Sequence, residues 1–192
     1  MIKNNINFSK ITEAVKAENK KWAGKSERDA SMSSTLIRYW KSVGITFLTA
    51  KQLQTSATQK KWPWSAAYIS YIAKQADISF PGSAAHRSYA KSGLKNRNKS
   101  KKNSWKLYSL TREQQPILCQ VGDILVGGRS GKYKNSHGDI VWSVKSSEKI
   151  AYLAGGNVSN TNKIDIKIYL NSDLTYNPSK KGKYLTVMKK MS

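Results

Sequence analysis

The sequence predicts a single α+β domain in which helices come first and an antiparallel sheet follows. The chain has 192 residues, about the length of one domain. Apolar residues recur with helical spacing in the first half and alternate with a period of two in the second half. Strands and helices do not alternate, as they would in a parallel sheet. We therefore expect one domain over 1–192, with a helical lead-in over 1–60 and the main core over 61–192.

Two amphipathic helices are expected in the lead-in. Residues 10–22 place apolar side chains on one stripe, with Ser9 positioned to cap the helix and Gly24 just past its end. The stretch 30–43 has the same pattern and stops before Gly44. These segments supply the apolar faces that pack on the rest of the domain.

Two more helices are expected before the sheet begins. Pro63 suits the first turn of a helix that ends before the break at 79–81. Ser83 is placed to cap a short helix that Gly93 would end. The following segment, 91–106, contains seven basic residues and no acid, so we expect an exposed basic loop there.

The second half of the chain predicts an antiparallel sheet. Strands are expected over 122–126, 137–144, 149–154, 163–170 and 184–188. In the second of these, one face would hold Gly138, Ile140, Trp142 and Val144, and the other His137, Asp139, Val141 and Ser143. In the fourth, Ile164, Ile166, Ile168 and Leu170 would share one side. The glycine-rich segment 127–132 lacks the spacing of a phosphate-binding loop and predicts a hairpin loop.

The charge of the chain is strongly positive. Thirty-four Lys and Arg against eleven Asp and Glu give a net charge of +23, most of it from Lys. Such a surface attracts polyanions such as nucleic acid, anionic lipid or envelope polymers. No apolar run is long enough to cross a membrane, and the first residues show no secretory signal. We expect a protein made in the cytoplasm that reaches any external site by another route.

Several kinds of chemistry are disfavoured by composition. One cysteine, Cys119, excludes an internal disulfide, and two histidines exclude ordinary structural zinc sites. No metal or cofactor motif is present, so none is expected. Cys119 lies among apolar residues and is interpreted as a buried small side chain. Asp123 and Asp139 lie near expected strands, but nothing in their spacing favours a paired-carboxylate glycosidase.

Ser65 is a candidate nucleophile because it opens an expected helix in WPWSAAYISYI. The free N–H groups and positive dipole end of a helix stabilise a developing oxyanion. The simpler interpretation is a cap or a small packing residue. Trp64, directly before it, is a candidate for the wall of a cleft.

A serine nucleophile needs a base, and His137 at the head of a strand is the first candidate. Asp139, on the same strand face, could orient the imidazole, although their Cα atoms lie ~7 Å apart. Asn157 in AGGNVSN is a second candidate orienter, or a simple turn residue. His86, on a partly apolar helix, is more often a structural histidine in such a position, yet it could line the cleft.

Four segments taken together resemble a known family. In order, they are WPWSAAYISYIAKQADISFPGSAAHRSYA, VGDILV, SHGDIVW and LAGGNVSN. They resemble the bacterial family DUF2272, itself similar to the NlpC/P60 and CHAP branches of papain-like hydrolases. The earlier segments NKKWAG and LIRYWKSVG look like the helical lead-in of that group. The resemblance therefore covers nearly the whole chain.

The resemblance implies a papain-like α+β fold with a catalytic core over 61–192. It implies Ser65 as the nucleophile, His137 as the base and Asn157 as the orienter, with Asp139 competing for that role. Gln59, six residues before Ser65, would be an oxyanion donor. The NlpC/P60 and CHAP relatives use cysteine as the nucleophile. Serine here leaves three possibilities: a true serine hydrolase or acyltransferase, a binding module without chemistry, or a chain whose cysteine was replaced.

The expected function is therefore that of a cell-envelope hydrolase, a peptidoglycan amidase or endopeptidase with a serine nucleophile. Without a visible signal peptide, it would reach the periplasm or wall as a phage lysin or an injected antibacterial effector. Its partners would be an anionic envelope polymer or lipid, delivery machinery and an immunity protein. Alternatives are a serine acyl hydrolase or transferase on lipid or ester substrates and a catalytically silent scaffold. A nucleic-acid-binding module using 91–106 and the Lys-rich C-terminus is disfavoured for want of a reading motif.

Overall fold

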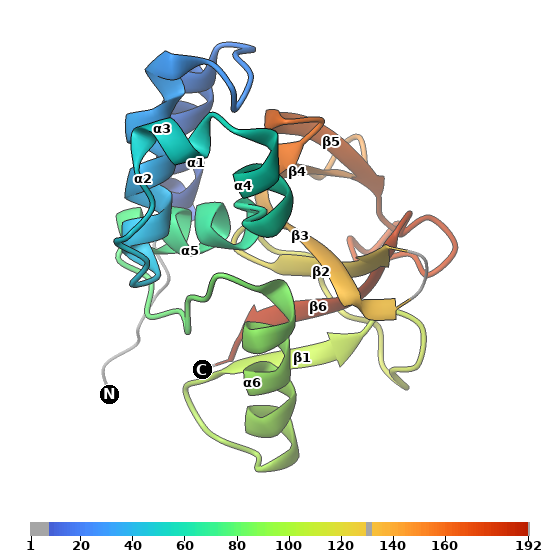
Figure 1. Cartoon of the computed structure of the whole chain (residues 1–192). Helices are drawn as coiled ribbons and strands as arrows, with labels where there is room; N and C mark the ends of the chain where they lie inside the picture. Colours follow the sequence, from blue (N-terminus) through green and yellow to red (C-terminus); the bar gives the residue numbers. More distant parts are fainter. Residues whose placement is uncertain (1–7, 130–131, 192) are drawn as a thin grey trace.

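A computed structural model describes residues 8–129 and 132–191 and confirms the α+β class (Figure 1). The helices are α1 (Phe8–Trp22), the 3-10 turn η1 (Ala30–Met32), α2 (Ser33–Ser42), α3 (Ala50–Leu53), α4 (Ser56–Lys61), α5 (Ser65–Gln75) and α6 (His86–Asn98). The strands are β1 (Trp105–Ser109), β2 (Ile124–Arg129), β3 (Lys132–Lys145), β4 (Ile150–Val158), β5 (Thr161–Tyr169) and β6 (Tyr184–Lys190). They form one antiparallel sheet in the order β1-β6-β2-β3-β4-β5.

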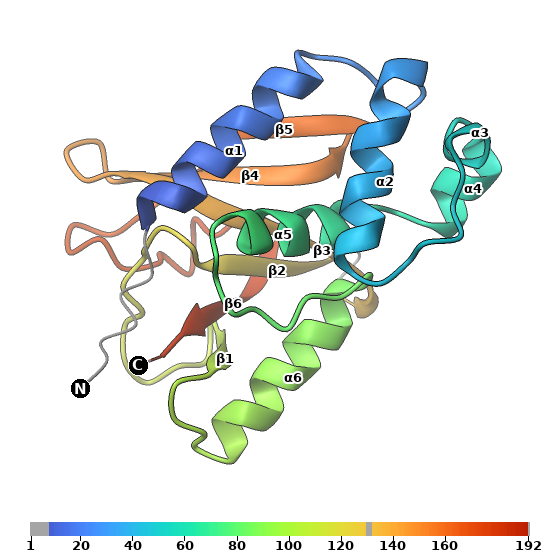
Figure 2. The ribbon, with the colours of Figure 1, turned by 90° about the vertical axis from the view of Figure 1, so that its left-hand side faces the viewer.

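Helices α1, α5 and α6 cover one face of this sheet (Figure 2). Along β2, Ile124 and Val126 join the core beneath the helices. Leu125 points to a second core on the opposite face, with Tyr176 and Tyr184. This alternation follows from the period of two along a strand. The sheet is therefore buried on both faces.

Aromatic side chains fix the start of α5 within the helical layer. The Trp64 ring stacks on Trp22 with centroids 4.7 Å apart. Trp22 Nε1 donates to the Tyr39 hydroxyl at 2.9 Å, which donates to Glu18 Oε2 at 2.7 Å. Trp64 Nε1 donates to Glu27 Oε2 at 2.6 Å. Because these buried polar atoms are all paired, the residue before Ser65 is held in one position.

Three of the four expected helices are confirmed with small shifts in their ends, but the fourth is longer than expected. Gly93 lies inside α6 rather than at its end. A Cβ at this position would lie 3.0 Å from Met188 Cε and 3.2 Å from the Leu107 nitrogen. The glycine therefore permits α6 to pack closely on the sheet. The prediction of an exposed loop over 91–106 was wrong, because 91–98 is helical and β1 begins at Trp105.

Bulges change the strand faces that were expected from a simple period of two. The β3–β4 register shifts between Val141 and Ser143. Beyond that point Val144 packs in the second core, whereas Trp142 packs beneath the helices. In β5, Ile164 likewise packs beneath the helices, apart from Ile166. The predictions that these residues share a face were wrong, because an extra residue in one strand reverses the alternation.

Two further predictions concern the burial of Cys119 and the absence of a membrane-spanning helix. Cys119 is buried, as expected, and burial raises the pKa of its thiol to about 12. Within residues 8–129 and 132–191, the helices all lack the length and apolar character needed to cross a membrane.

Candidate active site

Ser65 is the first residue of α5 and lines a surface pocket of about 600 Å³. Trp64 occupies the N-cap position and makes no side-chain capping hydrogen bond. The N–H groups of a first helical turn have no acceptor within their own helix, and they carry the positive end of its dipole. The Ser65 hydroxyl therefore lies beside backbone donors suited to a developing negative charge.

His86 provides the hydrogen-bond partner of that hydroxyl. Ser65 Oγ lies 2.6 Å from His86 Nε2, and both side chains are about 95% buried. His86 is the first residue of α6, so this bond joins the starts of two helices. A serine in contact with an imidazole nitrogen is the arrangement in which a base can take the hydroxyl proton during attack on a carbonyl.

Tyr89 holds the other ring nitrogen of His86. His86 Nδ1 is hydrogen bonded to the Tyr89 hydroxyl, which lies one helical turn further along α6. Burial, with the charge of Asp139, raises the pKa of Tyr89 well above its usual value, so the phenol stays neutral. Gly138 of β3 makes room for both side chains, because a Cβ there would lie 2.7 Å from His86 Nδ1 and 3.0 Å from the Tyr89 oxygen.

His137 and Asp139 form a second buried pair on β3. His137 Nε2 lies 3.0 Å from Asp139 Oδ1. The Tyr184 hydroxyl donates to Asp139 Oδ2 at 2.5 Å, and Lys183 Nζ lies 3.5 Å from the same oxygen. Burial alone would raise the pKa of Asp139. The hydrogen bond and charge of His137, with Lys183 and Tyr184, outweigh it and lower this pKa to about 2.

This lowered pKa predicts an acid-sensitive contribution to stability. Asp139 has an ordinary pKa of 3.8 and a folded pKa of about 2, so its contribution is complete above pH 4 and is lost as the pH falls toward 2. A shift of this size corresponds to about 2 kcal/mol. Urea unfolding of the parent and Asp139→Asn should show a stability gap at pH 6 that narrows by about this amount near pH 2. A gap independent of pH would contradict the assignment.

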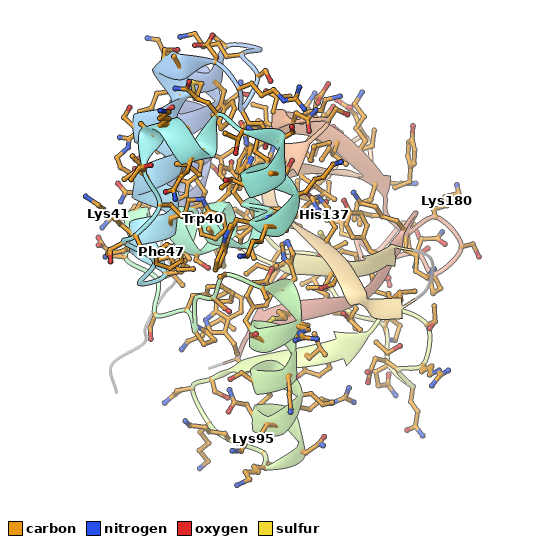
Figure 3. The ribbon with its side chains drawn as sticks, in the orientation of Figure 1. Trp40, Lys41, Phe47, Lys95, His137 and Lys180 are labelled. Carbon is orange, nitrogen blue, oxygen red and sulfur yellow. The ribbon has the colours of Figure 1, made fainter. Side chains whose placement is uncertain are left out.

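The two histidines lie close together and open onto different pockets. Their ring centroids are 5.6 Å apart, and Figure 3 shows His137 at the level of α4 and the top of α6. The 600 Å³ pocket is lined by Glu27, Arg28, Ser56, Gln59, Lys60, Pro63, Ser65, Ala84, Ala85, His86, Arg87, Ser136, Asn157, Ser159 and Asn160. A smaller one of about 140 Å³ is lined by Gly127, Gly128, His137, Asn157, Val158, Ser159 and Lys183. Asn157 and Ser159 border both.

The pairing of these side chains differs from the one expected from sequence. Ser65 Oγ is hydrogen bonded to His86, not to His137. His137 is paired with Asp139, the competing orienter, rather than with Asn157. The reason is the strand period: Gly138 faces α6, so its neighbours His137 and Asp139 turn toward the opposite face and Tyr184. Asn157 lies within β4 with a φ of +58° and borders the pocket.

Two further candidates for the cleft have structural partners. Trp64 is 1% exposed and lies in the core, so its expected place in the cleft wall was wrong. Its ring packs on Trp22, and Trp64 is absent from the residues that line the pocket. Gln59 does line the pocket, but its amide Nε2 donates to the Leu53 carbonyl at 2.9 Å. Its Oε1 accepts from Arg28 Nε at 3.4 Å. Gln59 therefore shapes the wall and holds Arg28.

Sequence reasoning missed Tyr89 and Glu27. The signal for Tyr89 was available, because His86 and Tyr89 are three residues apart on one helix and so share a face. Glu27 is 3% exposed and lies in a loop, where no periodic pattern marks it. Burial raises the pKa of Glu27, although the Trp64 N–H and Arg28 oppose the shift.

Comparison with known proteins gives one match. The family model described as an uncharacterized protein conserved in bacteria, DUF2272, matches residues 16–170. The chain belongs to this family. Searches of the curated proteins and of the solved structures found no match. The DUF2272 match contains Ser65, His86, Tyr89, His137 and Asp139. Lys183 and Tyr184, which contact Asp139, lie beyond its end.

Proposed function

We propose that this DUF2272 protein is a serine hydrolase that cleaves amide bonds in the peptide part of bacterial peptidoglycan. The observation that carries the proposal is the 2.6 Å contact between Ser65 Oγ and His86 Nε2 at the start of α5, on the wall of a 600 Å³ pocket. A nucleophile that opens a helix packed on an antiparallel sheet also supports a papain-like fold. The α5 helix contacts β3 and β4 in this way.

The geometry supports acyl transfer through Ser65. His86 with an unprotonated Nε2 accepts the hydroxyl proton while Ser65 Oγ bonds to the carbonyl carbon. In that tautomer Nδ1–H donates to the Tyr89 oxygen, which keeps the ring oriented. The carbonyl oxygen becomes an oxyanion that the first-turn N–H groups of α5 stabilise. His86 then protonates the leaving amine, and water hydrolyses the acyl-enzyme by the same steps.

The charges around the pocket support an anionic substrate. Arg28, Lys60 and Arg87 line it, against the single buried carboxylate of Glu27. The whole chain carries +23, which would hold the enzyme on an anionic wall. Peptide stems of peptidoglycan combine amide bonds with free carboxylates. The amide bonds suit attack by Ser65, and the carboxylates suit the positive charge around the pocket.

An acyltransferase is a second candidate, favoured by the smaller pocket. That pocket contains His137, whose ring lies 5.6 Å from His86, and it shares Asn157 and Ser159 with the larger one. An acceptor amine or hydroxyl bound there would replace water in the second step. Transfer would give a product heavier than either fragment of hydrolysis.

The test is digestion of purified peptidoglycan sacculi, with released fragments identified by mass spectrometry. We expect soluble fragments from the parent and from Ser146→Ala, an exposed serine on the β3–β4 turn. Ser65→Ala should lower the rate by at least about a thousandfold, since the nucleophile is removed. Fragment masses identify the bond and separate hydrolysis from transfer. Equal release from the parent and folded Ser65→Ala would contradict the proposal.

A further inference from the structure

Helix α6 carries a line of exposed basic side chains that begins at the active-site pocket. Arg87, Lys91 and Lys95 of α6 and Lys99, the C-cap of this helix, follow one another at intervals of four residues and are all exposed. We call these four residues the α6 track. Four helical residues rise ~6 Å, so the track runs for ~18 Å. Its first member, Arg87, lines the 600 Å³ pocket next to His86.

The opposite side of α6 is fully used in packing. Tyr89, Ala90 and Gly93 are buried against the sheet. Asn96 Nδ2 donates to the Trp105 carbonyl at 3.1 Å, and Arg97 makes a two-pronged ion pair with Glu113. The track therefore faces outward. Figure 3 shows Lys95 near the end of α6 that is far from α4 and His137.

The track has no acidic partner in the part of the chain that the structure describes. Helix α6 contains no Asp or Glu. The ion pairs found among residues 8–129 and 132–191 involve none of the four track residues. Four uncompensated charges in a row attract a ligand with repeated negative charges.

We propose that the α6 track is the docking surface for a peptidoglycan strand, whose peptide carboxylates bind along α6 while one peptide enters the pocket at Arg87. The proposal rests on the serine hydrolase function proposed above. The track begins at the pocket that Ser65 and His86 line. A surface that binds the substrate for this site must adjoin the pocket in this way. A nucleic-acid surface has no such requirement, and three of the four residues are Lys rather than the Arg that reads bases.

The test measures binding without turnover, using the full chain with Ser65→Ala. The probe is purified sacculi freed of phosphate-bearing polymers, sedimented with the protein at increasing NaCl. The track variant adds Lys91→Gln, Lys95→Gln and Lys99→Gln. The matched control adds Lys20→Gln, Lys41→Gln and Lys180→Gln, three exposed lysines elsewhere, and has the same net charge. Figure 3 shows Lys41 and Lys180 away from α6.

We expect the track variant to bind about tenfold more weakly at ~0.1 M salt, with a shallower salt dependence, and the control to change less than about twofold. Equal losses in the two variants would overturn the proposal, because net charge alone would then explain binding. The same three proteins are also titrated with duplex DNA at the same salt concentrations, and tighter, track-dependent binding of the DNA would overturn the proposal in favour of nucleic acid. Track-dependent binding by the Ser65→Ala protein, together with no fragment release by the parent, would support the docking surface and reject the hydrolase, so the two failures are distinguishable.

Discussion

Replacing His86 with alanine is expected to lower the rate of fragment release by about a thousandfold, the size typical of a lost general base. The reason is the contact of its Nε2 with Ser65 Oγ, which no other described imidazole makes. His137→Ala should lower the rate by no more than about tenfold, because His137 is bonded to Asp139 instead. The measurement is the initial rate on sacculi for both variants and the parent.

Both histidines are buried, so a loss of structure must be separated from a loss of chemistry. Thermal unfolding of each variant provides that control. Added imidazole should restore part of the activity of His86→Ala, since the removed ring leaves a space beside Ser65. If His137→Ala lowered the rate of fragment release more than His86→Ala did, with both proteins folded, His137 would be the general base. The serine hydrolase would then stand with a different base.

Replacing Lys189 with methionine is expected to destabilise the fold by about 3–5 kcal/mol. Lys189 Nζ contacts both oxygens of Asp123, at 2.7 and 2.6 Å, and both residues are buried. The Tyr176 hydroxyl also donates to Asp123 Oδ2, at 2.8 Å. Without Lys189, the carboxylate stays buried beneath the sheet with its main charge partner removed. Urea unfolding at pH 7 measures the change.

Two further variants separate this effect from loss of a lysine. Lys145 is the last residue of β3 and makes an exposed ion pair with Glu148. Lys145→Met removes this ion pair and should change the free energy of unfolding little. Asp123→Asn combined with Lys189→Met should be more stable than Lys189→Met alone, because the unpaired charge is gone. If Lys189→Met unfolds no more easily than Lys145→Met, the ion pair does not support the fold.

Most of the fold could be predicted from local patterns. The stripes of α1 and α2, the proline before α5 and the alternation in β3 and β5 are features of neighbouring residues, and each identified its element. The predicted end of α6 at Gly93 was wrong because a glycine can occupy a helix in either of two ways. A glycine ends a helix when its φ is positive, but here it admits the Met188 methyl group and the Leu107 backbone. The contact between Gly93 and Met188 joins residues 95 positions apart, which no local pattern contains.

The site was predictable only in part, for a similar reason. The helix-opening position of Ser65 and the nearness of His137 to Asp139 follow from local spacing. The choice between His86 and His137 as the partner of Ser65 depends on which side of β3 meets α6. Gly138 decides this, because only a residue without a side chain leaves room for the His86 ring. The sequence alone places this glycine on a face without showing what lies across it.

The place of β6 in the sheet also has a consequence for the order of assembly during synthesis. This strand, the last of those described, lies between β1 and β2, so β1 has its sheet partner only in β6. Residues 105–109 must therefore wait for a segment some 80 positions downstream to leave the ribosome. Pairings over such distances form slowly, and an unpaired strand edge invites association with other chains. Helix α6 packs on β1 in the folded structure and comes before it in the chain, so it is available to cover one side of β1 before β6 is synthesised.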